Sequence, residues 1–237
     1  MDKVIKTDDR IKTAAEFVRE GSVAADIGTD HGYLPIYLIK NGISVFAYAS
    51  DINEKPLLKS RENAIKYGVC DKISFHLSDG LDFVDRGEMK IEYPITDIVI
   101  CGMGGELIAD IIEKSGYPKK AGIRLILQPM TMAEKLRVYL AEAGFEIKDE
   151  KLCEAAGKIY TVICAEYDGC RREVNGADAY LGAKNIDRGG ELFRAYAKSL
   201  TAKLSVKISG LERGGHDSAD DQKLLDEIRR ITEETEE

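Results

Sequence analysis

The sequence predicts an α/β protein with a mostly parallel sheet, followed by a helical hairpin. Short apolar runs alternate with helix-like segments at a spacing of about 25 residues, which is typical of βαβ units. Glycine or aspartate follows most of these runs, at the strand ends where such sheets bind ligands. From Asp178 onward no convincing strand remains, and the pattern becomes helical.

Size and composition restrict the classes of protein to consider. The chain has 237 residues, enough for one α/β domain with a small appendage. Its first residues contain no apolar signal segment, and no run approaches the roughly 18–20 residues that span a bilayer, so we expect a cytoplasmic protein without membrane attachment. Five cysteines without C-x-x-C spacing and only three histidines argue against a disulfide framework and a metal site.

Helix and strand periodicities define the first elements. Ile11, Ala14 and Val18 recur at helical spacing. Pro35 stands in the first turn of the second helix, where its missing N–H costs nothing, and Gly68 closes the third helix. In order we expect a helix over 8–20, a strand over 23–27, a helix from 33 to a stop at 41–42, a strand over 45–50, a helix over 56–67, a strand over 72–77 and a short helix over 81–86.

The same rhythm completes the sheet. The run over 96–101 is the most continuous apolar segment of the chain and predicts a buried strand. Right-handed crossovers then place helices on both faces of the sheet. We assign residues 1–168 to this domain, with an N-terminal helix inside 1–20. The remaining elements expected are a helix over 106–114, a strand over 123–127, a helix over 131–143, and two antiparallel strands over 145–150 and 159–166.

The tail, residues 169–237, predicts a helical domain. Apolar positions 192, 193, 196, 200 and 204 follow helical spacing over 187–209, and positions 224, 225, 228 and 231 do so over 217–237. Gly214-Gly215 provides the turn between them. We therefore expect an antiparallel, coiled-coil-like hairpin.

The loop from Asp26 to Tyr33 is the strongest functional signal. It joins an apolar strand to a helix N-terminus, an arrangement that binds nucleotides. Its pattern is D-x-G-x-D-x-G, whereas a dinucleotide loop reads G-x-G-x-x-G so that the backbone can approach a pyrophosphate. Asp26 and Asp30 would repel a pyrophosphate but suit the ammonium and sulfonium of S-adenosylmethionine (SAM). The pattern favours SAM over NAD; the alternative is a plain strand–helix turn capped by Asp30.

Later strand ends supply further candidate contacts. Asp51 can accept hydrogen bonds from both ribose hydroxyls, or it caps the next helix. Asp79 can accept from the adenine amino group beside Gly80, or the pair forms a simple turn. Three glycines over 102–105 leave room for a flat ligand near the methyl group, or form a turn into a helix. Gln128 with Pro129 frames the target base or starts the next helix.

These motifs occur in one order, and together they resemble the bacterial tRNA (adenine-N1)-methyltransferase family that modifies adenine 22. The resemblance covers residues 8 to 166 and, more weakly, the tail. Met130 and Thr161 replace the asparagine and glutamate common in the family, which leaves details of base recognition open. The matching motifs are Asp26-x-Gly28-x-Asp30-His31-x-Tyr33-Leu34-Pro35, Asp79-Gly80-Leu81, Gly102-Met103-Gly104-Gly105 and Leu125-Ile126-Leu127-Gln128-Pro129, with Arg10 and Gly157-Lys158-x-Tyr160.

The resemblance implies a Rossmann-like class I methyltransferase with a seven-stranded, mostly parallel sheet whose last strand is antiparallel. It implies in-line transfer of the SAM methyl group to N1 of adenine, giving S-adenosylhomocysteine without a metal. N1 carries a lone pair at neutral pH, so positioning supplies most of the rate and no general base is required.

Roles follow for individual residues. Asp30 is the candidate to stabilise the developing cation and His31 to position the base, although His31 equally suits packing of the loop. Tyr33 offers a stacking surface for a flipped base, or joins the core. The candidate cofactor contacts are Asp26, Gly28, Thr29, Asp51, Ile52, Asp79, Gly80, Cys101, Gly102 and Met103, and the candidate substrate contacts are Arg10, Tyr33, Gly104, Gly105, Gln128, Pro129, Lys184, Arg188, Arg194 and Lys198.

Charge patterning in the tail bears on RNA binding. The chain carries a net charge of −8, yet seven basic and three acidic residues between Lys184 and Arg213 give that segment 7 − 3 = +4. The pairs 184/188, 194/198 and 203/207 lie four residues apart and predict a basic stripe for tRNA phosphates. The alternative is an ordinary solvated helix face.

Three rival functions remain at this point. A nicotinamide-dependent oxidoreductase requires a glycine pattern that the loop lacks. A non-catalytic RNA-binding protein would keep the SAM fold without turnover, and a small-molecule methyltransferase would not need the helical tail. Apart from tRNA, the sequence indicates no obligate protein partner.

Overall fold

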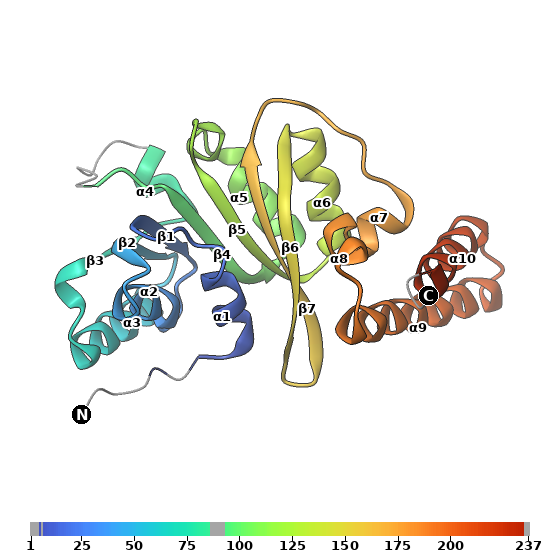
Figure 1. Ribbon diagram of the computed structural model, residues 1–237, viewed down its shortest axis with the longest axis horizontal. Coiled ribbons are helices and arrows are strands. Elements are labelled where there is room, and N and C mark those ends of the chain that lie inside the picture. Colours follow the sequence, from blue (N-terminus) through green and yellow to red (C-terminus); the bar gives the residue numbers. More distant parts are fainter. Residues whose placement is uncertain (1–4, 6, 86–92, 235–237) are drawn as a thin grey trace.

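A computed structural model describes residues 5, 7–85 and 93–234 (Figure 1). Within these residues seven strands form one sheet in the order β3-β2-β1-β4-β5-β7-β6. Strands β1 to β5 run parallel, and β7 is antiparallel to both β5 and β6, so the predicted mostly parallel sheet is confirmed. The strands are β1 (Ser22–Ile27), β2 (Ser44–Asp51), β3 (Ile73–Leu77), β4 (Asp97–Gly104), β5 (Arg124–Thr131), β6 (Phe145–Ala155) and β7 (Lys158–Tyr167).

Helices cover both faces of the sheet, as right-handed crossovers require. One face carries α1 (Asp9–Ala15), α2 (Tyr33–Lys40) and α3 (Glu54–Tyr67), and the other carries α4 (Asp82–Asp85), α5 (Gly105–Lys114) and α6 (Ala133–Glu142). Alternate strand residues serve the two layers: Ile98 and Ile100 pack under α5, whereas Val99 packs on the side of α1 and α2. Short 3₁₀ turns at Cys70–Lys72 and Tyr117–Lys119 lead into β3 and β5.

The first helix is shorter than the predicted 8–20. It ends at Ala15, and the chain then turns to Gly21, which has φ 73°. Arg19 explains the early end, because its guanidinium bonds the fully buried Asp97 carboxylate at 3.1 Å and the carbonyl of Gly122 at 2.9 Å. These bonds attach the segment to the amino end of β4 instead of continuing the helix.

Three strands end well beyond their predicted ends, and one of them is β5, which continues from the predicted end at 127 to Thr131. β4 continues through Gly102 to Gly104, with an irregular register against β5 at this point. β6 continues to Ala155, because it forms a long hairpin with β7 that turns at Ala156 and Gly157, both at positive φ. The predicted helix over 81–86 is present as α4, with its last position outside the described residues.

The tail contains the predicted hairpin and two further short helices. α9 (Glu191–Arg213) and α10 (Ala219–Glu234) pack through Leu204, Ile208, Leu225 and Ile228, and extend away from the sheet (Figure 1). The single helix predicted over 187–209 is wrong at its start. Gly189 and Gly190, at φ 57° and 89°, separate α9 from α8 (Ala183–Arg188), which follows the unpredicted α7 (Gly176–Leu181). Residues 235–237 of the predicted last helix lie outside the described residues.

A buried ion pair attaches the tail to the sheet domain. Arg137 on α6 and Glu150 on β6 are each 1% exposed, with 2.7 Å between Nε and Oε1. Arg137 also donates to the carbonyls of Ala179 and Tyr180 at the end of α7. One guanidinium therefore joins three elements across the boundary between the two parts of the chain.

None of the described helices is both long and apolar enough to cross a bilayer. Likewise, the described part of the chain holds no group of three or more His, Cys, Asp or Glu residues arranged to bind a metal ion.

Candidate functional site: an acidic pocket at the carboxyl ends of β1 to β5

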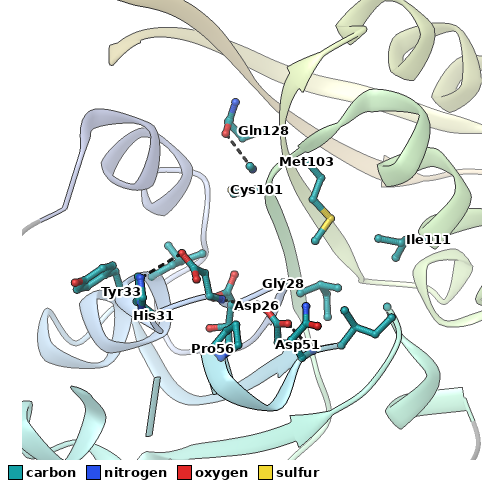
Figure 2. Close-up of a pocket in the computed structure, with 18 of the residues that line it drawn as sticks. Asp26, Gly28, His31, Tyr33, Asp51, Pro56, Cys101, Met103, Ile111 and Gln128 are labelled. Atoms are coloured by element: carbon teal, nitrogen blue, oxygen red, sulfur yellow. Dashed lines mark hydrogen bonds and ion pairs between the residues drawn. The ribbon is translucent and has the colours of Figure 1, made fainter. Parts of the chain in front are cut away.

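A pocket of about 640 Å³ opens at the carboxyl ends of β1 to β5 (Figure 2). The strand order reverses direction between β1 and β4, and open α/β sheets bind ligands at such a switch point. The pocket brings together most of the residues proposed from sequence. These are Arg10, Asp26, Gly28, Thr29, Asp30, His31, Tyr33, Asp51, Ile52, Asp79, Gly80, Cys101, Gly102, Met103 and Gln128.

The β1–α2 loop is held in place by its own backbone and by the end of β2. The amides of Gly28 and Thr29 both donate to the carbonyl of Ser50, at 2.8 and 2.9 Å. Gly28 has φ 76°, and a Cβ there would lie 2.1 Å from the Met103 Cε. Any side chain at position 28 would therefore strain the backbone and fill the space between β1 and β4.

Asp26 is the buried carboxylate of the pocket. It is 5% exposed, at the end of β1. The pKa of Asp26 is raised to about 7, chiefly by burial and in part by the nearby carboxylates of Asp51 and Asp30. A buried acid with two acidic neighbours favours a cationic ligand group, since such a group stabilises the ionised form.

Asp51 is fixed by two backbone amides. Its Oδ1 accepts from the amide of Asn53 at 2.8 Å, and its Oδ2 accepts from the amide of Asp30 at 3.4 Å. The carboxylate is 9% exposed and faces the pocket at the end of β2. Next along the sheet, Asp79 is exposed after β3, and Gly80 has φ 54°. This edge of the pocket can accept hydrogen bonds from a ribose and from an adenine amino group.

The end of β4 forms the opposite wall. The amide of Gly102 donates to Oε1 of the fully buried Gln128 at 3.1 Å (Figure 2). Gln128 Nε2 donates to the carbonyl of Pro129. Burial, with Asp26 nearby, raises the pKa of the Cys101 thiol far above its usual range. Cys101 is therefore a neutral wall residue and not a nucleophile.

Asp30, His31 and Tyr33 occupy the more open end of the pocket. The side chains of Asp30 and His31 are 72% and 46% exposed, and Asp30 Oδ2 lies 3.7 Å from His31 Nε2. Asp30 has φ 46°, an uncommon conformation for a residue with a side chain. The His31 and Tyr33 rings meet edge to face, across the pocket from Met103 and Ile111 (Figure 2).

The remaining predicted substrate residues lie elsewhere. Gly104 and Gly105 do not line the pocket. Gly105 has a packing role, because a Cβ there would lie 2.2 Å from the Met132 carbonyl oxygen. Pro129 lines a second hollow, described below.

The predicted basic stripe is not one surface. Lys184 and Arg188 lie on α8, where Arg188 pairs with Asp149 at 2.7 Å. Arg194 and Lys198 line a hollow between α9 and α10. The reason is the break at Gly189-Gly190 together with helical geometry, since positions 198 and 203 lie about 140° apart around α9.

Sequence reasoning missed several lining residues. Leu107 and Ile111 come from α5, and Asn53, Pro56 and Ser78 follow β2 and β3. The amphipathic pattern of α5 hides the first two, because a helix residue that faces a pocket resembles one that faces the core. Asn53 and Ser78 stand directly beside predicted strand ends, so proximity to Asp51 and Asp79 was the available signal.

Comparison with known proteins places the chain in a family. A family model described as a methyltransferase domain matches residues 7–163. The tRNA (adenine(22)-N(1))-methyltransferase of Bacillus subtilis is 39% identical over 70% of this chain and 70% of its own length. A candidate tRNA adenine-22 methyltransferase of Streptococcus pneumoniae, solved in complex with SAM, has a TM-score of 0.80 at 30% identity, covering 94% of this chain and 99% of that one.

A third relative was solved with the cofactor product. The TrmK protein of M. capricolum, in complex with S-adenosylhomocysteine, has a TM-score of 0.82 at 26% identity and covers 97% of this chain and 99% of that one. Both solved structures thus span the helical tail as well as the sheet domain. With its methyltransferase domain, its pocket at the β1–β4 switch point and these relatives, the chain belongs to the tRNA (adenine(22)-N1)-methyltransferase family.

Proposed function

We propose that this protein transfers the methyl group of SAM to N1 of adenine 22 in tRNA. The observation that carries the proposal is the charge of the pocket. Four aspartates line it among the described residues, whereas its one arginine, Arg10, is already paired with Asp8 at 2.5 Å. Such a lining repels a pyrophosphate and accommodates the ammonium and sulfonium of SAM.

The residues present fit this cofactor. Asp26, buried at the end of β1, suits the ammonium group, and Gly28 leaves the backbone bare beside it. Asp51, held by two amides, suits the ribose hydroxyls, while Asp79, Gly80 and Ile52 suit the adenine. Thr29, Cys101, Gly102 and Met103 complete the predicted cofactor set.

The chemistry requires little from acid–base groups. When bound, SAM supplies an electrophilic methyl group: the N1 lone pair forms the new N–C bond while the S–C bond breaks and its electron pair returns to sulfur. The chain contributes orientation of the adenine and stabilisation of the positive charge that develops on its ring. We assign the second task to Asp30, whose carboxylate is exposed at the open end of the pocket, and the first to His31 and Tyr33.

The family membership supports tRNA as the substrate, and a tRNA-modifying activity supports a cytoplasmic location. For N1 to reach the pocket, the target base must leave its stack, and Tyr33 offers an aromatic surface for it. Gln128, fixed between the Gly102 amide and the Pro129 carbonyl, holds the wall of the pocket in shape.

The test incubates the full chain with SAM and an unmodified tRNA transcript, and maps modified nucleosides by mass spectrometry. We expect 1-methyladenosine at position 22, and none in a matched transcript with guanine there. Bound SAM without this product would refute the assignment and favour a non-catalytic RNA-binding protein. Methylation of small molecules alone would favour the small-molecule alternative, and NAD binding would favour an oxidoreductase.

A further inference from the structure

A second hollow, of about 400 Å³, lies between the carboxyl end of β5, the amino end of β7 and helix α9. We call it the α9 cleft. It lies where the β6–β7 hairpin runs beside α9 (Figure 1). Its lining combines three tyrosines, two lysines and one carboxylate with apolar side chains: Pro129, Met130, Thr131, Met132, Ala133, Glu134, Ile159, Tyr160, Thr161, Tyr180, Tyr196, Leu200, Lys203, Leu204 and Lys207.

Three side chains form a ridge between the cleft and the cofactor pocket. Arg10 lines the cofactor pocket, and its Nη1 lies 2.9 Å from the sulfur of Met130. The same guanidinium lies over the Tyr160 ring, 5.4 Å from its centre. Met130 and Tyr160 in turn line the α9 cleft. A polymer that extends from one hollow into the other must therefore cross the ridge of Arg10, Met130 and Tyr160.

Helix α9 presents cations on two opposite sides. Lys203 and Lys207 face the cleft, whereas Arg194 and Lys198 line the hollow against α10. Lys207 is paired with Asp221 at 2.7 Å. Within the described residues neither Lys203 nor Lys198 pairs with a carboxylate, and both are exposed. Lys203 is thus the unpaired cation that lines the cleft. Lys198 has the same charge and also no carboxylate partner, but it lies on the other side of the same helix.

The cleft wall also stores backbone strain. Met132, 43% exposed, has φ 56° at the start of α6, and its carbonyl packs directly on Gly105. A side-chain-bearing residue in this conformation persists only where its surroundings impose it, which is typical of ligand-contacting segments. Here it turns an apolar methionine towards a cleft that also holds aromatic rings and a free cation, the combination that binds unstacked nucleotides.

We propose that the α9 cleft binds the RNA backbone next to the target adenine, with Lys203 on a phosphate and the ridge of Arg10, Met130 and Tyr160 beneath the bridging nucleotide. This inference rests on the proposed tRNA substrate. It assigns the two sides of α9 different tasks, since only the Lys203 side lines a hollow whose wall contacts Arg10 of the cofactor pocket.

The test compares two charge reversals on one helix, Lys203→Glu and Lys198→Glu, in the full-length protein. Binding of unmodified tRNA is measured by fluorescence anisotropy with S-adenosylhomocysteine present, so that no turnover occurs. We expect Lys203→Glu to raise the Kd for tRNA about tenfold and to lower the slope of log K against log salt by about 1, while Lys198→Glu changes the Kd less than about twofold. The affinity for S-adenosylhomocysteine should be equal in both variants and the wild type.

Equal effects of the two reversals would overturn the proposal, because they would indicate general electrostatic attraction. No effect of Lys203→Glu would overturn it as well. Failure of the proposed function looks different: the wild type would bind tRNA through Lys203, yet form no 1-methyladenosine when SAM is supplied.

The ridge is tested through Tyr160, as a positioning residue. Tyr160→Phe keeps the ring under Arg10 and should leave the KM for tRNA within about twofold, whereas Tyr160→Leu removes the aromatic face and should raise it about fivefold or more at an unchanged Kd for SAM. Equal KM values for the two variants would remove Tyr160 from the substrate path.

Discussion

The buried carboxylate of Asp26 predicts that SAM binding releases a proton. The pKa of Asp26 is raised to about 7, chiefly by burial, so near pH 6 the acid is mostly protonated in the free protein. A cation bound beside it favours the ionised form. Binding at pH 6 therefore expels this proton, whereas at pH 8 the carboxylate is already ionised and no proton needs to leave.

The magnitude follows from the same pKa. With a free pKa near 7, only about one tenth of the protein is ionised at pH 6 and about nine tenths at pH 8, so the Kd for SAM should be about tenfold weaker at pH 6. The stability of the free protein depends on pH in the opposite direction to its affinity for SAM. A carboxyl raised from 3.8 to about 7 stabilises the free protein below pH 4 and loses this contribution as pH rises to 7, a loss of about 4 kcal/mol.

Isothermal titration calorimetry in two buffers of different ionisation enthalpy measures the released protons. We expect close to one proton at pH 6 and close to none at pH 8. Asp26→Asn should abolish the release, weaken SAM binding at pH 8 about tenfold, and raise the free energy of unfolding of the free protein at that pH. Asp51→Asn is the matched control, since it should weaken binding and keep most of the proton release, because burial is the chief cause of the raised Asp26 pKa. A Kd independent of pH, or an Asp26→Asn variant no more stable than the wild type at pH 8, would refute the reasoning.

Three further predictions concern packing and catalysis. Gly105→Ala should lower the free energy of unfolding by about 2 kcal/mol or more, because its Cβ meets the Met132 carbonyl, while Gly116→Ala, with open space around it, should change it little. Arg137→Met should cost about 3–5 kcal/mol in chemical denaturation by leaving Glu150 unpaired, and Arg137→Met with Glu150→Leu should recover most of that loss; a single variant within about 1 kcal/mol of wild type would contradict this role. Asp30→Asn should lower kcat on tRNA about tenfold or more and keep the Kd for SAM within about twofold; an unchanged kcat would remove Asp30 from catalysis.

Features of the structure that depend on one local sequence pattern were predicted correctly. The strand ends at Asp26, Asp51 and Asp79 were predictable, because parallel strands bring their carboxyl ends to one edge of the sheet whatever the details of packing. The seven-stranded, mostly parallel sheet and its antiparallel last strand followed from the resemblance and agree with the structure. Helix α10 followed from apolar spacing alone.

Contacts between residues far apart in the sequence explain some of the features that were not predicted correctly. The end of α1 depends on Arg19 reaching Asp97, a residue 78 positions away. The glycines of the Gly102–Gly105 segment were read as space for a ligand, yet Gly105 serves the close approach of the β5–α6 turn. The basic stripe failed for a geometric reason: i, i+4 pairs lie side by side, but successive pairs rotate around the helix and two glycines interrupt it.

In the proposed reaction, a single residue of the β1–α2 loop connects the two substrates. The amide of Asp30 donates to the Asp51 carboxylate, which we assign to the ribose, while the exposed Asp30 side chain lines the pocket beside His31. Asp30 adopts this arrangement at φ 46°, an uncommon conformation for a residue with a side chain. We therefore expect a ribose bound to Asp51 to fix the backbone that carries Asp30. On this proposal the acceptor base meets a carboxylate that is already oriented, so that one loop would serve both methyl transfer and cofactor binding.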